Sequence, residues 1–214
     1  MTHIVLLGDS IFDNAMYVPS SCSVIDQVQQ HLTEAGDRAT LLALDGSYIN
    51  GIAHQLQKLP EDATHLFIST GGNDVLGFGW KLYSETMSFP DVLEKILVMK
   101  HQFHHDYQTM LHQVLAHQKP VTLCTVYDQS PQSDTLFTLF AQTILPLFND
   151  CITRQAIAFG LPLIDLRLVC DDLGDYSSLS PIEPSVQGGG KIAQHIAMIA
   201  KEHDFSMPRT VCYS

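Results

Sequence analysis

The sequence is poor in positive charge and has no long hydrophobic run. It contains 11 Lys and Arg residues against 23 Asp and Glu residues, which gives a formal net charge of -12. Nucleic acids and anionic membrane surfaces both attract a basic face, and no cluster of Lys and Arg is present. No apolar stretch approaches the roughly 20 residues that cross a bilayer. We therefore expect neither a nucleic-acid partner nor membrane insertion.

Cysteines are few, and none belongs to a metal or redox motif. The five cysteines are an odd number without a CxxC pair, which indicates free thiols in a reducing compartment. The first residues, MTHIVLLGDS, lack the basic region of a signal peptide. We expect a cytoplasmic protein whose mature chain begins at Met1.

Five short runs rich in Val, Ile and Leu alternate with segments of helical period. They are His3 to Leu7, Thr40 to Leu44, His65 to Thr70, Pro120 to Tyr127 and Leu161 to Leu166. Each is continuously apolar, as in a strand covered on both faces. The alternation predicts an α/β fold in which helices cover both sides of a five-stranded parallel sheet. We expect one doubly wound domain over residues 1–205 and a loose tail over 206–214.

Two longer segments have helical spacing. The segment from Asp91 to Gln118 places apolar residues along one side of a helix. The segment from Asp134 to Phe159 contains Pro146 in its interior, which predicts a kink or a break, and Gly160 is expected to end it.

Residues that could take part in catalysis or binding follow four of the predicted strands. In chain order they are GDSIFDN (Gly8 to Asn14), LDGS (Leu44 to Ser47), TGGND (Thr70 to Asp74) and the pair Tyr127 and Asp128. Ligands bind outside the carboxyl ends of parallel strands. We expect a serine, two glycine turns and an Asn amide to meet at this edge.

Three of these residues fit the needs of acyl transfer. A hydroxyl nucleophile needs donors aimed at the oxyanion that forms as it attacks. Ser10 can supply the hydroxyl and its own N–H, Gly46 a backbone N–H without a Cβ in the way, and Asn73 a side-chain amide. Singly, each has a structural alternative as a helix cap or a turn residue. Their occurrence at three successive strand ends favours the catalytic interpretation.

GDSIFDN, Gly46 and GGND resemble blocks I, II and III of the SGNH (GDSL-type) hydrolase family. The resemblance spans nearly the whole chain and implies a three-layer α/β/α sandwich with the flavodoxin-like strand order. It implies Ser10 as the nucleophile, and an oxyanion hole formed by the N–H groups of Ser10 and Gly46 and the Asn73 amide. The family cleaves esters and related acyl groups without a metal or organic cofactor, so we expect neither.

The last family block departs from its usual form. The family pattern is DxxHPxxxGxxxIA, and the corresponding segment here, SPIEPSVQGGGKIA, begins at Ser180. Pro184 and Gly188 fall in register. Glu183 therefore occupies the histidine position and Ser180 the aspartate position, so two members of the family's triad are absent.

The 11 histidines offer no evident replacement for the missing base. His101, His105 and His112 share one face of the predicted long helix, roughly opposite its apolar side. Their spacing could hold a metal ion, but a solvated helix face is the favoured interpretation.

Glu183 is the remaining candidate base. A carboxylate with an ordinary pKa of about 4.3 is a weak base for a hydroxyl, and burial or nearby negative charge would strengthen it. The candidate neighbours, which are also candidate substrate contacts, are Asp9, Asp13, Asp74 and Asp128. In the structural alternative, Glu183 caps a helix or pairs with Lys191 or Arg167.

The segment from Val75 to Phe89 follows Asn73 and contains the only Trp, Trp80, and two glycines. We interpret it either as a flap that walls an acyl pocket, with Trp80 at the substrate, or as a segment whose aromatic residues pack in the core. Lys81 is the one basic group close enough to meet an acidic or phosphorylated substrate.

Together these features predict a serine acyl hydrolase, esterase-like or lipase-like, for a small ester or acyl substrate. Turnover is expected to be slow, because the oxyanion hole alone retains part of the catalysis when the base is lost. The alternative is an impaired enzyme that uses the oxyanion hole to bind a ligand. A flavodoxin-like nucleotide or flavin binder is disfavoured, because two aspartates lie where a phosphate would sit and no GxGxxG or Walker A pattern occurs.

Overall fold

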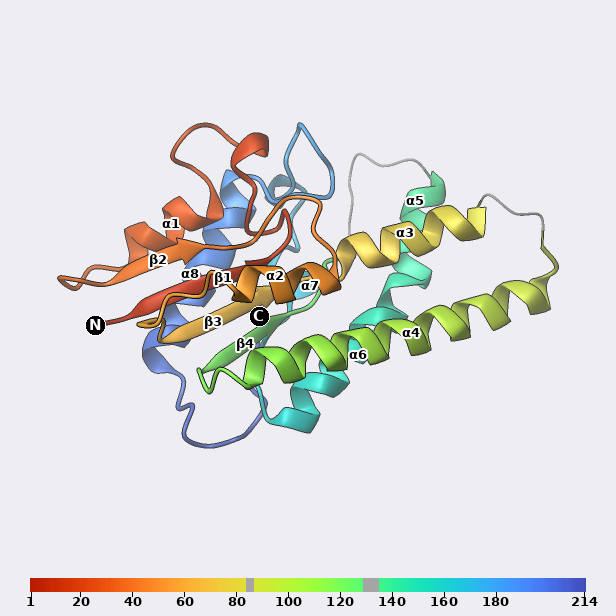
Figure 1. Ribbon diagram of the computed structural model, residues 1–214. Helices are drawn as coiled ribbons and strands as arrows, with labels where there is room; N and C mark the ends of the chain where they lie inside the picture. The colour runs from red at the N-terminus through yellow and green to blue at the C-terminus, as the bar shows by residue number, and fades with distance from the viewer. Residues whose placement is uncertain (84–86, 129–134) are drawn as a thin grey trace.

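The computed structural model describes residues 1–83, 87–128 and 135–214, without the side chains of residues 80, 81, 83 and 135–137. Its centre is a six-stranded parallel sheet in the order β2-β1-β3-β4-β5-β6 (Figure 1). The strands are β1 His3–Gly8, β2 Arg38–Leu41, β3 His65–Ser69, β4 Val121–Cys124, β5 Leu163–Ile164 and β6 Cys212–Tyr213. The predicted parallel sheet is confirmed.

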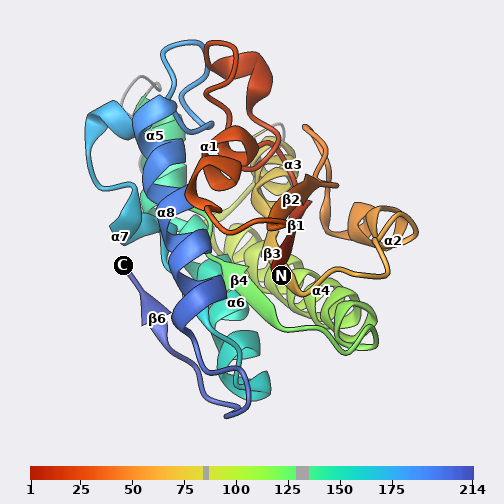
Figure 2. The ribbon, with the colours of Figure 1, turned by 90° about the vertical axis from the view of Figure 1, so that its left-hand side faces the viewer.

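The helices form two layers. They are α1 Val24–His31, α2 Ile52–Leu56, α3 Gly72–Tyr83, α4 Phe89–Leu115, α5 Thr135–Thr143, α6 Leu145–Phe159, α7 Leu166–Val169 and α8 Val186–Glu202. Short 3-10 turns are η1 Ala15–Tyr17, η2 Ile49–Gly51 and η3 Leu173–Asp175. Helices α1 and α8 pack on one face of the sheet and α2, α4 and α6 on the other (Figure 2). The predicted three-layer α/β/α sandwich is confirmed.

The side chains of β1 point alternately to the two faces of the sheet, and this explains why helices cover both faces. Val5 and Leu7 face the core under α2 and α4, whereas Ile4 and Leu6 face the core under α1 and α8. All four side chains are fully buried. A strand with apolar residues on both faces is stable only between two helical layers.

The chain end differs from the prediction. Cys212–Tyr213 form β6 and pair with β5, so the sheet has six strands instead of five. The expected loose tail over 206–214 is therefore wrong at its end. A two-residue strand carries too little hydrophobic pattern to be recognised, and it is held by backbone bonds to Leu163 and Asp165 at 2.9 Å.

The two predicted helical segments have the expected form. α4 begins after Ser88, which forms a reciprocal cap with Asp91. The second segment is broken into α5 and α6, with Pro146 in the first turn of α6, where a missing N–H costs no hydrogen bond. Gly160 ends α6 with φ of +63°.

Candidate active site

Ser10 follows β1 directly, in a turn that depends on Gly8. Gly8 has φ of +136°, and a Cβ there would lie 1.8 Å from the Ser69 carbonyl oxygen, so only glycine allows β1 and β3 to come this close. The Gln55 side chain accepts from the Gly8 N–H and donates to its carbonyl, both at 2.8 Å. Ser10 itself is 7% exposed. These contacts at Gly8 hold the backbone that leads into Ser10.

The Glu183 carboxylate lies close enough to Ser10 and Ser180 for both side chains to influence its pKa by hydrogen bonding. Glu183 is 3% exposed. Burial raises the pKa of Glu183, hydrogen bonding to Ser180 and Ser10 opposes this rise, and the charge of Asp45 adds to it. Its Oε2 has no hydrogen-bond partner among the described residues. The positions that resemble the family's Ser, His and Asp are therefore brought together as Ser10, Glu183 and Ser180.

Backbone contacts place residue 183, independently of its side chain. The Glu183 carbonyl accepts from Ser177 N–H at 2.9 Å. The next carbonyl, that of Pro184, accepts from the Asn14 amide at 3.1 Å, and the preceding one, that of Ile182, accepts from the Tyr127 hydroxyl. Two of three successive carbonyls are thus tied to other parts of the molecule, and the third closes the loop on itself.

The structural alternatives for Glu183 are wrong. Lys191 donates instead to Asp175 at 2.7 Å, and Arg167 donates to Asp165 at 2.6 Å. α8 is capped by Ser185. Glu183 consequently remains a buried carboxylate beside Ser10, without a cation partner in the described part of the chain.

Gly46 lies in the loop of residues 44–49, with φ of +74°. Four side chains from other parts of the chain hold this loop. Two are carboxylates that accept backbone N–H groups: Asp13 accepts from Asp45 at 2.9 Å, and Asp74 accepts from Ile49 at 3.0 Å. Two are amides that donate to Ser47: Asn73 to its carbonyl at 2.9 Å, and Gln55 to its Oγ at 3.3 Å. Gly46 is exposed, and its N–H has no acceptor among the described residues. The loop therefore holds a free N–H on a fixed backbone.

Two buried aspartates beside these loops have unusual acidity. Asp9 is 4% exposed, and its Oδ1 accepts from Ile11 N–H at 3.2 Å. Burial raises the pKa of Asp9 to about 7, with further upward contributions from the charges of Asp74 and Glu183. Burial also raises the pKa of Asp74 to about 6. The charged forms of Asp9 and Asp74 are thus disfavoured at this site.

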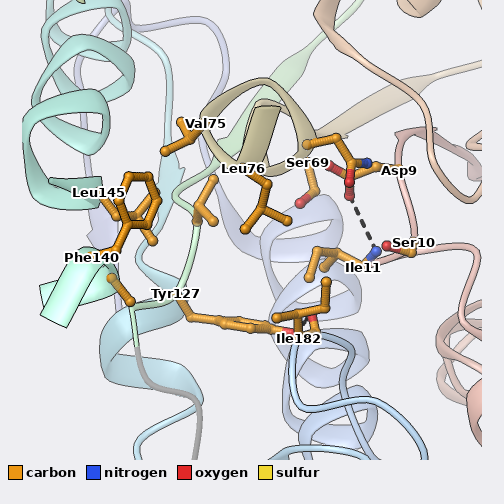
Figure 3. Close-up of a pocket in the computed structure, with 14 residues that line it drawn as sticks. Asp9, Ser10, Ile11, Ser69, Val75, Leu76, Tyr127, Phe140, Leu145 and Ile182 are labelled. Carbon is orange, nitrogen blue, oxygen red and sulfur yellow. Dashed lines mark hydrogen bonds between the residues drawn. The ribbon is translucent and has the colours of Figure 1, made fainter. Parts of the chain in front are cut away.

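A pocket opens beside Ser10 between α3, α5 and the end of β4 (Figure 3). Its lining residues are Asp9, Ser10, Ile11, Ser69, Gly72, Asn73, Val75, Leu76, Val126, Tyr127, Phe140, Ala141, Leu145 and Ile182. Polar side chains are confined to a minority of these residues. The pocket therefore places a hydroxyl and an amide beside a mostly apolar space, as expected of a site that binds a small apolar group.

The structure brings some predicted site residues together and separates others. Asp9, Ser10 and Asn73 line the pocket, and Glu183 contacts Ser10. The remaining described candidates, Gly46, Asp13, Asp74 and Asp128, are not among its lining residues. Asp13 and Asp74 accept backbone N–H groups of the Gly46 loop, while burial raises the pKa of Asp128 and the charge of Arg167 opposes the rise.

The segment from Val75 to Phe89, which could have formed a flap, is helical as far as Tyr83, because α3 spans Gly72–Tyr83. Its first residues, Val75 and Leu76, do line the pocket. Gly79 lies against α5, where a Cβ would lie 2.8 Å from Phe140 Cζ. This glycine is therefore needed for helix packing, and it does not act as a hinge. The side chains of Trp80 and Lys81, predicted near the substrate, lie outside the described residues.

No histidine lines the pocket. His101, His105 and His112 are exposed on α4, as the helix-face interpretation predicts. Across the described residues, no group of three or more His, Cys, Asp or Glu side chains could hold a metal ion. A search of the same residues for a helix that could span a membrane also finds none.

Sequence reasoning missed three positioning residues. Asn14 donates to the Pro184 carbonyl and accepts from Val24 N–H at 2.8 Å, so it links the loop before α8 to the start of α1. Gln55 binds the backbone of Gly8, and Tyr127 binds the carbonyl of Ile182. Asn14 and Tyr127 stand in the strand-end motifs, so their position was a usable signal. Gln55 lies in a short helix with no motif around it.

The strongest resemblance to known proteins is structural. No family model and no curated protein matches the sequence. An extracellular lipase from Streptomyces rimosus superposes with a TM-score of 0.66 at 16% identity, covering 94% of this chain and 100% of that one. A phospholipase A1 from Streptomyces albidoflavus gives 0.64 at 15% identity, with 91% and 98% covered.

A third match connects this fold to the sequence motifs. A member of the lipolytic protein G-D-S-L family from Veillonella parvula gives a TM-score of 0.60 at 14% identity, covering 94% of this chain and 98% of that one. Identities this low establish the fold alone. The chain therefore has the fold of the SGNH, or GDSL-type, hydrolases.

Proposed function

We propose that the protein is a serine acyl hydrolase that acts on small esters, with Ser10 as the nucleophile and Glu183 as its base. The observation that carries the proposal is the contact between the Ser10 hydroxyl and the buried Glu183 carboxylate, beside a pocket that Asn73 also lines. Lipases and a phospholipase among the structures of the same fold favour an ester as the substrate.

In the first half of the reaction, Ser10 Oγ attacks the ester carbonyl as its proton passes to Glu183. The carbonyl oxygen gains negative charge and is held by the Asn73 amide together with the N–H groups of Ser10 and Gly46. The tetrahedral intermediate then collapses, and the departing alcohol oxygen takes the proton from Glu183. Water releases the acyl group in the second half by the same steps, with Glu183 again accepting a proton.

Burial makes Glu183 a better base than an exposed glutamate. Its pKa is raised because the charged form loses hydration. A base works best when its pKa lies near the operating pH, and a carboxylate remains less suited to this than a histidine near neutral pH. The account therefore predicts slow turnover that persists in mildly acidic solution.

The direct test is hydrolysis of p-nitrophenyl acetate and butyrate by the full chain and by Ser10→Ala. Removal of the nucleophile should lower kcat by about a thousandfold or more. Ser178→Ala is the matched control, because Ser178 is exposed on the loop that carries Glu183. Equal rates for the full chain and Ser10→Ala would refute the proposed function.

A ligand-binding protein without turnover is the second candidate, favoured by the occupation of the usual His and Asp positions by Glu183 and Ser180. A fluorophosphonate distinguishes the two functions, because it reacts only with an activated serine. The hydrolase should be modified at Ser10, as located by peptide mass spectrometry, whereas a binding protein should remain unmodified.

A further inference from the structure

The pocket beside Ser10 has two unlike ends. Asp9, Ser10 and Ser69 lie at one end, and Phe140 and Leu145 lie at the other (Figure 3). Between them the wall is formed by Leu76, Tyr127 and Ile182. The Tyr127 hydroxyl is already bound to the Ile182 carbonyl. Away from Ser10, the space therefore suits a chain of carbon atoms.

The far end is bounded by the Phe140 ring, which packs against α3 at Gly79. A Cβ at Gly79 of α3 would lie 2.8 Å from Phe140 Cζ and 2.9 Å from Phe140 Cε2. Contacts this short mean that Phe140 occupies the space that any other residue at position 79 would need. The ring consequently cannot move further toward α3.

The described lining of the pocket offers no positive charge. Its one carboxyl group is that of Asp9, at the near end (Figure 3). The described lining residues include no Lys, Arg or His. A carboxylate on the substrate's acyl chain would therefore lose hydration in a mostly apolar space without a cation to replace it.

We propose that the acyl chain of the substrate is short and uncharged, and that Phe140, packed against Gly79, limits its length. This inference rests on the proposed function, because it takes Ser10 as the point from which the chain extends. Phe140 acts on specificity alone. It contributes no group to the chemistry.

The first experiment compares p-nitrophenyl esters of two to ten carbons on the full chain and on Phe140→Ala. The full chain should gain about fourfold in kcat/KM for each methylene buried and lose rate once the chain reaches Phe140. Phe140→Ala should move the optimum to longer chains. An unchanged optimum would overturn the role of Phe140.

Gly79→Ala and Gly77→Ala form a matched pair of variants for the same assay. Both add a methyl group to α3 and favour the helix, but only the methyl at position 79 meets the Phe140 ring. A Cβ at Gly77 meets nothing described within 4 Å. Gly79→Ala should change the chain-length profile and Gly77→Ala should preserve it. Identical profiles for both variants would contradict the proposal.

The charge of the acyl chain is tested with two esters of equal length. The p-nitrophenyl butyrate ester should exceed the p-nitrophenyl monoester of succinate by about a hundredfold or more in kcat/KM. Comparable rates would show that the pocket tolerates an anion and would overturn this part of the inference.

Binding of 1-butanol, 1-hexanol and 1-octanol, followed by NMR shifts of the pocket methyl groups, provides a readout without turnover. Phe140→Ala should extend binding to the longer alcohol. If the full chain hydrolyses no ester, the proposed function fails, and these alcohols still test the pocket. If Ser10-dependent hydrolysis occurs with a chain-length optimum indifferent to Phe140, only the present inference fails.

Discussion

The candidate site consists of two regions that are built differently. The donor loops, residues 8–14, 44–49 and 70–74, present a hydroxyl and N–H groups at three neighbouring strand ends. The base loop, residues 177–185, brings a single carboxylate to them. Side chains bind backbone groups in both regions, such as Asn73 on Ser47 in the donor loops and Asn14 on Pro184 in the base loop. The regions differ in the reacting groups themselves: the Asn73 amide supports the donor loops, whereas the Glu183 carboxylate binds no backbone group among the described residues.

This difference explains how a glutamate can stand where the resemblance leads one to expect a histidine. The carbonyls of residues 182, 183 and 184 fix the backbone whatever side chain residue 183 carries. In the donor loops, by contrast, Asn73 both faces the pocket and supports the Gly46 loop. Substitutions in the donor loops should therefore affect structure and chemistry together, whereas substitution of Glu183 should affect chemistry alone.

Glu183→Gln should have the largest effect on activity among the following variants. The amide keeps the size of the side chain but accepts no proton, so kcat should fall by about 10² to 10⁴-fold with little change in thermal stability. Glu202→Gln, an exposed substitution at the end of α8, is the control. A kcat within twofold of the parent would exclude Glu183 as the base.

Asn73→Ala tests the donor loops. Loss of an oxyanion donor should lower kcat by about 10² to 10³-fold. Because the Asn73 amide also donates to the Ser47 carbonyl at 2.9 Å, stability should fall by about 1 kcal/mol. Thermal unfolding measured beside kcat separates the two effects. A variant with lowered stability and full activity would limit Asn73 to support of the Gly46 loop.

Asn14→Ala tests the attachment of the base loop. Its loss frees the buried Pro184 carbonyl and Val24 N–H, so the free energy of unfolding should fall by about 2 kcal/mol or more. A looser base loop should lower kcat by about tenfold, with KM nearly unchanged. Denaturant unfolding and initial rates are the measurements. Unaltered kcat in a destabilised variant would show that Asn14 does not position Glu183.

Asp9→Asn should have the smallest effect, confined to higher pH. The pKa of Asp9 is raised to about 7, so above that pH a negative charge appears near Ser10 and opposes the oxyanion. The parent's kcat should fall several-fold from pH 7 to pH 9, and the variant's should not. Between the ordinary pKa of 3.8 and about 7 the folded state also holds the extra proton, so the free energy of unfolding should decline with pH more steeply in the parent than in the variant. Parallel profiles in both proteins would contradict this role.

Much of the fold and of the donor loops could be predicted because their signals are local. Continuous apolar runs define β1 and β3, Pro146 marks the break between α5 and α6, and the strand-end motifs place Ser10 and Asn73 at one pocket. Each depends on neighbouring residues and on the geometry of a parallel sheet.

The other features depend on contacts between distant parts of the chain. Lys191 pairs with Asp175, so it is not the partner of Glu183. Residues 75–83 continue α3, where Gly79 packs against Phe140 of α5, and β6 depends on the edge of β5. Sequence spacing contains no information about these long-range partners.

The central claim is that Glu183 accepts the proton of Ser10, and the most direct measurement is the pH dependence of Ser10 modification by a fluorophosphonate. The rate in the full chain should rise with pH through an inflection above the ordinary glutamate pKa of 4.5, because burial raises it. In Glu183→Gln the modification should be about a hundredfold or more slower, without that inflection. Equal rates and equal pH profiles in the two proteins would contradict the account.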